Sequence, residues 1–391
     1  MRVLYSLFLC FFIQFNWSQV SVDPNKISYK EALVQSKKEK KPIFIMLYAN
    51  WCPHCNTMKS TVFSDQKVKD FMNANYISVW KDIEKEDGKE IKEHYKTNGL
   101  PTFLFIEADE TLLYSIKGEM KTEAFINEAT NALNPKLQLP YLEQQFLNNP
   151  SNVNACLAYI QTLRKGADRT ALSVPTHLYL KTQTDQQLLS EINWRVISNG
   201  VTDIESREFQ YVLKNKEAFE KITSPKRVDA KITNIVSELL EPYTINLDSV
   251  AYFQKKEIAK TIQLQKTDSL IFSYDLLLAE RTKNWGFYKK TTLENTEKYF
   301  WHTDSKLKEI GQVYWKEIAD VTALKKAIEW GKRALELNNS AEGNLLLARL
   351  YAKIKDKKTA LLYAKNANAI TKEMGWDTTD TDAILKELNT K

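Results

Sequence analysis

Short apolar runs separated by helix-like spacing dominate the first third of the chain. β-prone apolar runs predict buried strands, and they lie at residues 42–49, 76–80, 102–107 and 111–117. Helices are expected at about 28–40, where Ser28 and Glu31 have the spacing of a capping box, and from 52 onward. Two more are expected at 87–97, which is polar and ends at Asn98-Gly99, and at 122–133, where apolar residues lie on one face. Strands that alternate with helices predict an α/β domain, which we place at residues 19–135.

The pattern changes at Asn134-Pro135. Beyond this point strand alternation disappears, glycines are sparse and no proline follows Pro242. Long stretches keep the spacing of three and four that is typical of amphipathic helices. We therefore expect residues 136–391 to form an all-α helical domain.

A repeat is visible near the end of this helical region. Two pairs of alanines, each with members seven residues apart, are offset from each other by 33 residues; they are Ala327 with Ala334 and Ala360 with Ala367. The pattern resembles tetratricopeptide (TPR) repeats, whose period is 34 residues. We expect TPR-like helical hairpins at about residues 308–374. A helical bundle with small residues at close contacts would give the same pattern.

Residues 1–18 have the pattern of a secretory signal peptide. Arg2 precedes an apolar run from Val3 to Phe15, which is too short to span a bilayer comfortably. Ser18 is a small residue suited to cleavage. The segment predicts a cleavable signal and a mature protein that is periplasmic or otherwise exported. An uncleaved membrane anchor is the alternative.

Composition narrows the classes of function. A net charge of +6 over 391 residues, with no basic block, argues against a nucleic-acid partner. Export implies an oxidising compartment, and removal of the signal leaves Cys52, Cys55 and Cys156. Three cysteines are too few for a disulfide framework, so we expect the close pair to be catalytic. Cys156 lies in a helical run, where a buried apolar role is expected.

The close pair lies in the stretch Trp51-Cys52-Pro53-His54-Cys55, between an apolar strand and a helix start. Unpaired N–H groups at a helix N-terminus stabilise a thiolate at the first cysteine. Cys55 follows one turn later on the same face, where it can close a disulfide with Cys52. Half of a zinc site and a purely structural disulfide are the alternatives. A second Cys or His pair at zinc-binding spacing is not visible in the sequence, so we expect no metal.

These features resemble the thioredoxin superfamily over roughly residues 28–133. The Trp before the first cysteine and the two-residue spacer are family features, and Gly99-Leu100-Pro101-Thr102 is similar to the family's cis-proline loop. Gly118 stands about where the family has a glycine ahead of its last helix. The resemblance implies a cis Leu100–Pro101 bond beside a redox-active Cys52–Cys55 disulfide. It also implies that Leu100 offers its backbone to an extended substrate.

Position within the motif assigns roles to its residues. Cys52 is the expected nucleophile and Cys55 the resolving thiol, while Pro53, His54 and Trp51 surround and tune the thiolate. The Cys-Pro-His-Cys spacer is that of the oxidase DsbA. The flanking sequence resembles instead the C-terminal domain of the thiol reductase DsbD. One departure is Met46, which stands where many thioredoxins have a buried acid that helps to deprotonate the resolving thiol.

The sequence thus predicts an exported thiol–disulfide oxidoreductase without a cofactor, in which reduction is favoured over oxidation. Its expected partners are protein thiols and disulfides, an upstream thiol reductase or oxidase, and a protein bound to the helical domain. The alternative from another class is a helical adaptor whose thioredoxin-like domain serves only as a binding module.

Overall fold

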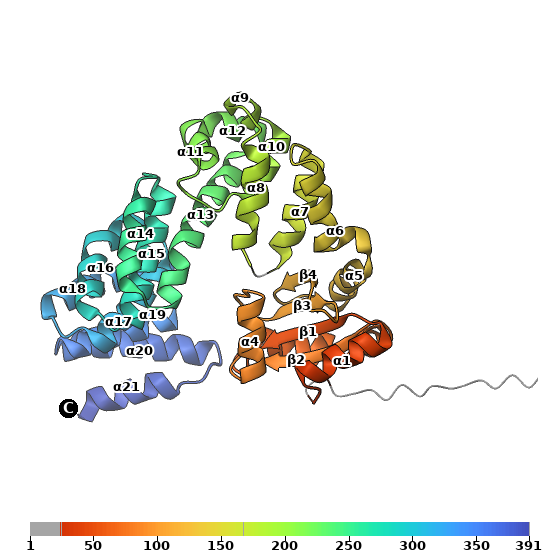
Figure 1. Cartoon of the computed structure of the whole chain (residues 1–391). Helices are drawn as coiled ribbons and strands as arrows, with labels where there is room; N and C mark the ends of the chain where they lie inside the picture. Colours follow the sequence, from red (N-terminus) through yellow and green to blue (C-terminus); the bar gives the residue numbers. More distant parts are fainter. Residues whose placement is uncertain (1–23, 25, 167, 391) are drawn as a thin grey trace, which may run out of the picture. The chain divides into compact units, whose positions relative to one another are not determined.

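The computed structural model describes residues 24, 26–166 and 168–390 (Figure 1). These residues form two compact units that meet in sequence at Ser224 and Pro225. The predicted signal peptide, residues 1–18, lies outside the described residues. Among the described helices, none combines the length and the apolar character that crossing a bilayer requires.

A four-stranded sheet of order β2-β1-β3-β4 organises the first unit. Its strands are β1 (Ile43–Tyr48), β2 (Ile77–Asp82), β3 (Thr102–Ile106) and β4 (Leu112–Lys117). Strand β1 pairs in parallel with β2 and antiparallel with β3, and β3 pairs antiparallel with β4. The strands lie where the apolar runs predicted them, with β2 displaced slightly toward its C-terminal end.

Six elements surround the sheet in the first third of the chain. They are α1 (Tyr29–Glu39), α2 (Pro53–Thr57), the π-helical turn η1 (Met58–Val62), α3 (Gln66–Asn75), α4 (Glu86–His94) and α5 (Thr122–Leu133). Ser28 and Glu31 form a reciprocal capping box at the start of α1, as the spacing of Ser and Glu predicts. Asp65 caps α3 by accepting a hydrogen bond from the Lys67 N–H.

The sheet is buried on both faces. Successive side chains of a strand point to opposite sides, so each face contributes to a core of its own. Phe44 and Met46 of β1 belong to one core, together with residues of α2, η1, α3 and α5. Ile43 and Ile45 belong to a second core with residues of α1 and α4. Helices on both faces explain why β1 is apolar at every position instead of alternating. The expected α/β domain is confirmed.

Further helices follow within the same compact unit. They are η2 (Pro135–Leu137), α6 (Leu139–Asn148), α7 (Val153–Lys165), η3 (Thr170–Leu172), α8 (Ser173–Leu180), α9 (Asp185–Leu188), α10 (Glu191–Gly200), α11 (Arg207–Lys214) and α12 (Lys216–Ile222). Helices α6 and α7 contact β4. The Lys165 ammonium donates to the Tyr114 hydroxyl at 2.5 Å and to Glu128 at 2.9 Å. The sheet and the first helices thus share one unit, while the domain boundary expected at residue 135 stays a prediction.

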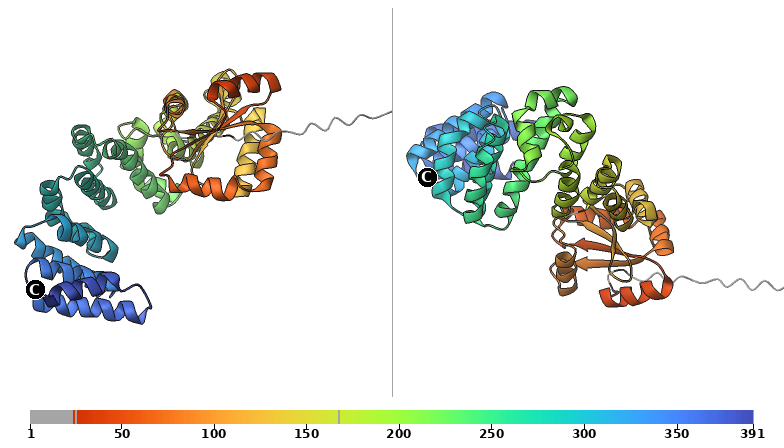
Figure 2. Two further views of the ribbon diagram at one scale, coloured as in Figure 1. Left: turned by 90° about the horizontal axis from the view of Figure 1, so that it is seen from below. Right: turned by 45° about the horizontal axis from the view of Figure 1, so that its top comes forward.

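The second unit is built from α13 (Pro225–Ile245), α14 (Ser249–Lys260), α15 (Gln265–Arg281), α16 (Trp285–Phe300), α17 (Asp304–Glu317), α18 (Val321–Leu337), α19 (Ala341–Lys353), α20 (Lys357–Glu373) and α21 (Thr379–Thr390). Consecutive helices pack against each other, as Figure 2 shows for the blue C-terminal end. Within the described residues, every element after β4 is a helix, which confirms the all-α expectation. The repeated alanines are buried, and the TPR-like assignment stays a prediction.

Candidate redox site

The first cysteine stands at the junction between β1 and α2. Cys52 is the N-cap residue of α2, with extended backbone, and Pro53 occupies the first helical turn. The Cys52 sulfur accepts a hydrogen bond of 3.2 Å from the Cys55 backbone N–H. An N-terminal helical N–H lacks an intrahelical acceptor, so this donor is available to a sulfur that carries negative charge.

Cys52 and Cys55 form a disulfide with a Cα–Cα separation of 5.3 Å. Cys55 is fully buried, and Cys52 keeps 3% of its surface exposed. Both residues are thus buried, and Cys52 is the one that keeps some exposed surface. Cys156 is a free, buried cysteine, and its burial raises the pKa of its thiol to about 12.

The loop before β3 contains a cis peptide bond between Leu100 and Pro101. Gly99 precedes it with a φ of 98°, in the left-handed region that favours glycine. The Pro101 carbonyl accepts a hydrogen bond of 2.9 Å from the Gly118 N–H. Leu100 packs against the core that contains both paired cysteines.

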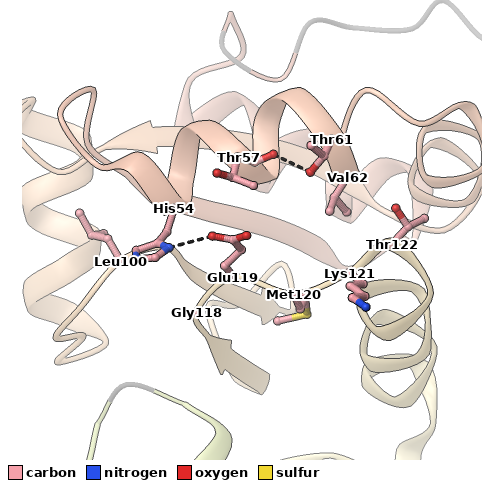
Figure 3. Close-up of a pocket in the computed structure, with 10 residues that line it drawn as sticks. All are labelled: His54, Thr57, Thr61, Val62, Leu100, Gly118, Glu119, Met120, Lys121 and Thr122. Atoms are coloured by element: carbon pink, nitrogen blue, oxygen red, sulfur yellow. Dashed lines mark hydrogen bonds and ion pairs between the residues drawn. The ribbon is translucent and has the colours of Figure 1, made fainter. Parts of the chain in front are cut away.

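A groove of about 750 Å³ lies beside this loop. Figure 3 shows its lining, in which His54 and Leu100 come from the two motifs that the sequence singled out. Glu119 lines the same groove, and its Oε2 lies 2.7 Å from the His54 Nδ1. Glu119 is thus a direct partner of His54, the histidine between the two cysteines. Sequence reasoning missed Glu119, because 65 positions separate the two residues.

The other side of the site is held by residues at the end of β2. Trp51 is 66% exposed, and its indole N–H donates to the Glu84 carboxylate at 3.0 Å. Asp82 is 5% exposed and accepts a hydrogen bond of 2.9 Å from the Asn50 side chain. Sequence reasoning also missed this buried acid, which lies on the strand next to Met46.

A lysine and a tyrosine pack together near this acid. The Lys59 ammonium lies 3.0 Å from the centre of the Tyr48 ring, a cation–π contact. Burial lowers the pKa of Lys59. Burial also raises the pKa of Tyr48, and the negative charge of Asp82 adds to that rise. Among the residues that the structure describes, no group of three or more His, Cys, Asp or Glu side chains could hold a metal ion.

The chain matches one family model, described as a thioredoxin-like domain, over residues 29–132. This match covers the sheet, its helices, the disulfide and the cis-proline loop. Residues 29–132 are a thioredoxin-like domain.

Individual relatives match less than a third of the chain. One is the "Thiol:disulfide interchange protein DsbD" of Pseudoalteromonas atlantica, 29% identical over 115 residues, which are 28% of this chain and 19% of the relative. Another is the "Disulfide bond reductase DsbH" of Chlamydia pneumoniae, 29% identical over 92 residues, which are 21% of this chain and 55% of the relative. The chain therefore spans about a fifth of DsbD and about half of DsbH.

Solved structures also match only part of the chain. One described as "DsbH Oxidoreductase" is 25% identical, covers 31% of this chain and 92% of that chain, and has a TM-score of 0.26. A putative disulphide-isomerase from Bacteroides thetaiotaomicron is 27% identical, covers 28% and 89%, and has a TM-score of 0.26.

Proposed function

We propose that this protein is an exported thiol–disulfide oxidoreductase that works mainly as a reductase of partner proteins. The observation that carries the proposal is the Cys52–Cys55 disulfide at a helix start, within a thioredoxin-like domain whose cis-proline loop lines the adjacent groove. The names of the relatives DsbD and DsbH support the same chemistry.

The reaction transfers two electrons to a partner disulfide. The Cys52 thiolate attacks one partner sulfur, an S–S bond to Cys52 forms, and the other partner sulfur leaves as a thiolate that takes up a proton. The Cys55 thiolate then attacks the Cys52 sulfur. This step closes the Cys52–Cys55 disulfide and releases the second partner sulfur, which also takes up a proton. The partner leaves reduced, and the protein is left oxidised.

Return to the dithiol form requires an upstream thiol reductase, since the oxidised pair has no electrons to give. We assign the neighbouring residues supporting roles in this cycle. Pro53, His54 and Trp51 shape the surroundings of the Cys52 thiolate. Leu100 and Pro101 present backbone to an extended partner segment, as edge-pairing recognition requires. The helical region would recruit a protein partner.

Trapping of mixed disulfides tests the proposal directly. Cys55→Ser should attack partners but fail to resolve, so covalent complexes accumulate on non-reducing gels of protein purified from its native compartment. Cys52→Ser should trap few, because the remaining thiol is fully buried. Cys156→Ser, a buried cysteine outside the site, is the matched control and should behave like the wild-type chain.

The adaptor hypothesis predicts no difference in trapping between the two cysteine variants. Met46 is buried and apolar, so it cannot take the proton of Cys55 as a buried acid would, and this observation favours the adaptor. Equal trapping by Cys52→Ser and Cys55→Ser, or none by either, together with no reduction of a model disulfide in dithiothreitol, would replace the enzyme with the adaptor.

Export is tested separately. Mass spectrometry of the secreted or periplasmic protein should find a chain that begins after Ser18. A membrane-bound product that retains residues 1–18 would establish the anchored form instead.

A further inference from the structure

Glu119 occupies a fixed position at the rim of the redox site. Its two chain neighbours are both fastened: the Gly118 N–H donates to the Pro101 carbonyl at 2.9 Å, and the Met120 N–H donates to the Met58 sulfur at 3.4 Å. One anchor is the cis-proline loop, and the other is the turn η1, which continues α2. The carboxylate of Glu119 is thus presented to His54 from a backbone held on both sides.

The contact between Glu119 and His54 is close and directional. Nδ1 of His54 lies 2.7 Å from Oε2 of Glu119, and the side chains are 66% and 40% exposed. The remaining charged side chain along the groove's described lining is Lys121. At such exposure a single ion pair contributes little to folding stability. Its effect falls instead on the side chain it binds, which belongs to the two-residue spacer between the cysteines.

The spacer histidine influences the cysteines through the reduced form. When an imidazole N–H or an imidazolium charge is offered to the Cys52 thiolate, the thiolate and hence the dithiol form are stabilised. A carboxylate that accepts the Nδ1 N–H of His54 takes up that donor, so it is no longer available to the thiolate. Its negative charge also opposes that of the sulfur. Both effects disfavour the thiolate, which makes the disulfide a weaker oxidant.

We propose that Glu119 is a positioning residue that binds His54 and thereby shifts the Cys52–Cys55 couple toward the reducing potentials of an electron donor. The inference rests on the proposed thiol–disulfide exchange and explains how a Cys-Pro-His-Cys spacer can serve a reductase. The equilibrium that reports this shift is the exchange with glutathione. The dithiol protein and oxidised glutathione react to give the disulfide protein and two molecules of reduced glutathione, with two electrons transferred.

The test is the equilibrium of the full-length mature chain with defined glutathione buffers, followed by gel shift after thiol alkylation. Glu119→Gln should move the equilibrium about fivefold toward the reduced protein. At about 30 mV per tenfold change, this is a rise of about 20 mV in potential. Glu123→Gln is the matched control. It removes the same charge four residues away, where the partner is the exposed Lys67 at 3.8 Å, and should leave the potential unchanged.

A double-mutant cycle separates positioning from simple charge. In a His54→Ala background, Glu119→Gln should shift the equilibrium by less than twofold, because the residue that Glu119 positions is gone. An equal shift with and without His54 would overturn the positioning role, as would an unchanged potential in Glu119→Gln. Both outcomes leave the proposed exchange intact. A wild-type pair that does not exchange with glutathione would overturn the proposed function and this inference together.

Discussion

The side-chain amide of Asn50 donates a hydrogen bond of 2.9 Å to the buried carboxylate of Asp82. The other oxygen of Asp82 accepts the Glu84 backbone N–H at 3.0 Å. One carboxylate therefore joins the segment just before Cys52 to the turn after β2. The Ile83 N–H, which donates to the Tyr48 carbonyl at 2.9 Å, adds a backbone link. Contacts around Asp82 thus fix the segment before Cys52 against the end of the sheet.

Asp82→Ala should lower the free energy of unfolding by about 1–3 kcal/mol, because it removes two hydrogen bonds to a charged acceptor, from the Asn50 side chain and the Glu84 backbone. Urea unfolding followed by circular dichroism measures the change. Asp70→Ala is the control, since Asp70 is exposed on α3 and accepts from Gln66, and it should change stability by less than about 0.5 kcal/mol. Equal effects of the two substitutions would show that Asp82 does not hold the loop.

Gly88→Ala should destabilise the same region by sterics. A Cβ at Gly88 would lie 2.0 Å from the Asp82 carbonyl oxygen and 2.5 Å from its carbon, so helix α4 would have to move away from the end of β2. Overpacking of this kind costs about 1–3 kcal/mol. Lys89→Ala, at the exposed neighbouring position, should leave the thermal midpoint nearly unchanged. A Gly88→Ala protein as stable as the wild type would contradict the close approach.

The second unit contains a buried ion pair. The Lys256 ammonium lies 2.6 Å from an Asp275 oxygen, with side-chain exposures of 13% and 6%, and the Tyr252 hydroxyl donates to Asp275 at 2.8 Å. Burial raises the pKa of Asp275 despite these two partners. Because the folded pKa is raised, stability from this group is present below the unfolded pKa and is lost as pH rises through the folded value.

A single substitution in this pair should therefore lower the free energy of unfolding, whereas the double substitution should restore or raise it. Lys256→Met leaves an unpaired buried carboxylate and should cost about 3–5 kcal/mol at pH 7. Adding Asp275→Leu should restore wild-type stability or exceed it by about 1–4 kcal/mol. Chemical denaturation of the three chains provides the comparison. A double variant as unstable as Lys256→Met would mean that the pair itself stabilises the helices.

Cys156 should behave as an inert, pH-linked core residue. Burial raises the pKa of its thiol from 9.0 to about 12, so between these values the unfolded chain loses a proton that the folded chain keeps. Stability from this group is present below pH 9 and is lost as pH rises toward 12. Cys156→Ala should make the decline of stability above pH 9 shallower than in the wild type, where tyrosines also titrate. Identical slopes would contradict the burial of the thiol.

The same difference should appear in alkylation. At pH 8, after mild reduction, iodoacetamide should modify Cys52 before any other site and leave Cys156 untouched until denaturant is added. Peptide mass spectrometry identifies the modified residues. Rapid labelling of Cys156 in the folded protein would show that this thiol is open to solvent.

Much of this molecule could be predicted from local patterns, because strands, helix caps and short motifs depend on residues that are close together in the sequence. The capping box at Ser28, the run that forms β1 and the paired cysteines are of this kind. Glu119 and Asp82 are different, since each reaches the redox site through the pairing of strands rather than through sequence proximity. The signal available was only Gly118, beside Glu119, and nothing local distinguishes Asp82 from the other acids around it.

The packing of α6 and α7 against β4 has a consequence for self-association. Strand β4 is the last strand of its sheet, and an uncovered last strand offers its backbone groups to a strand of another molecule. Residues 24–134 alone would lack this cover and would expose Tyr114, which is 1% exposed in the whole chain. Light scattering should therefore find the 24–134 fragment in oligomers or aggregates and the 24–224 fragment as a monomer. Helices α6 and α7 would then prevent self-association through β4.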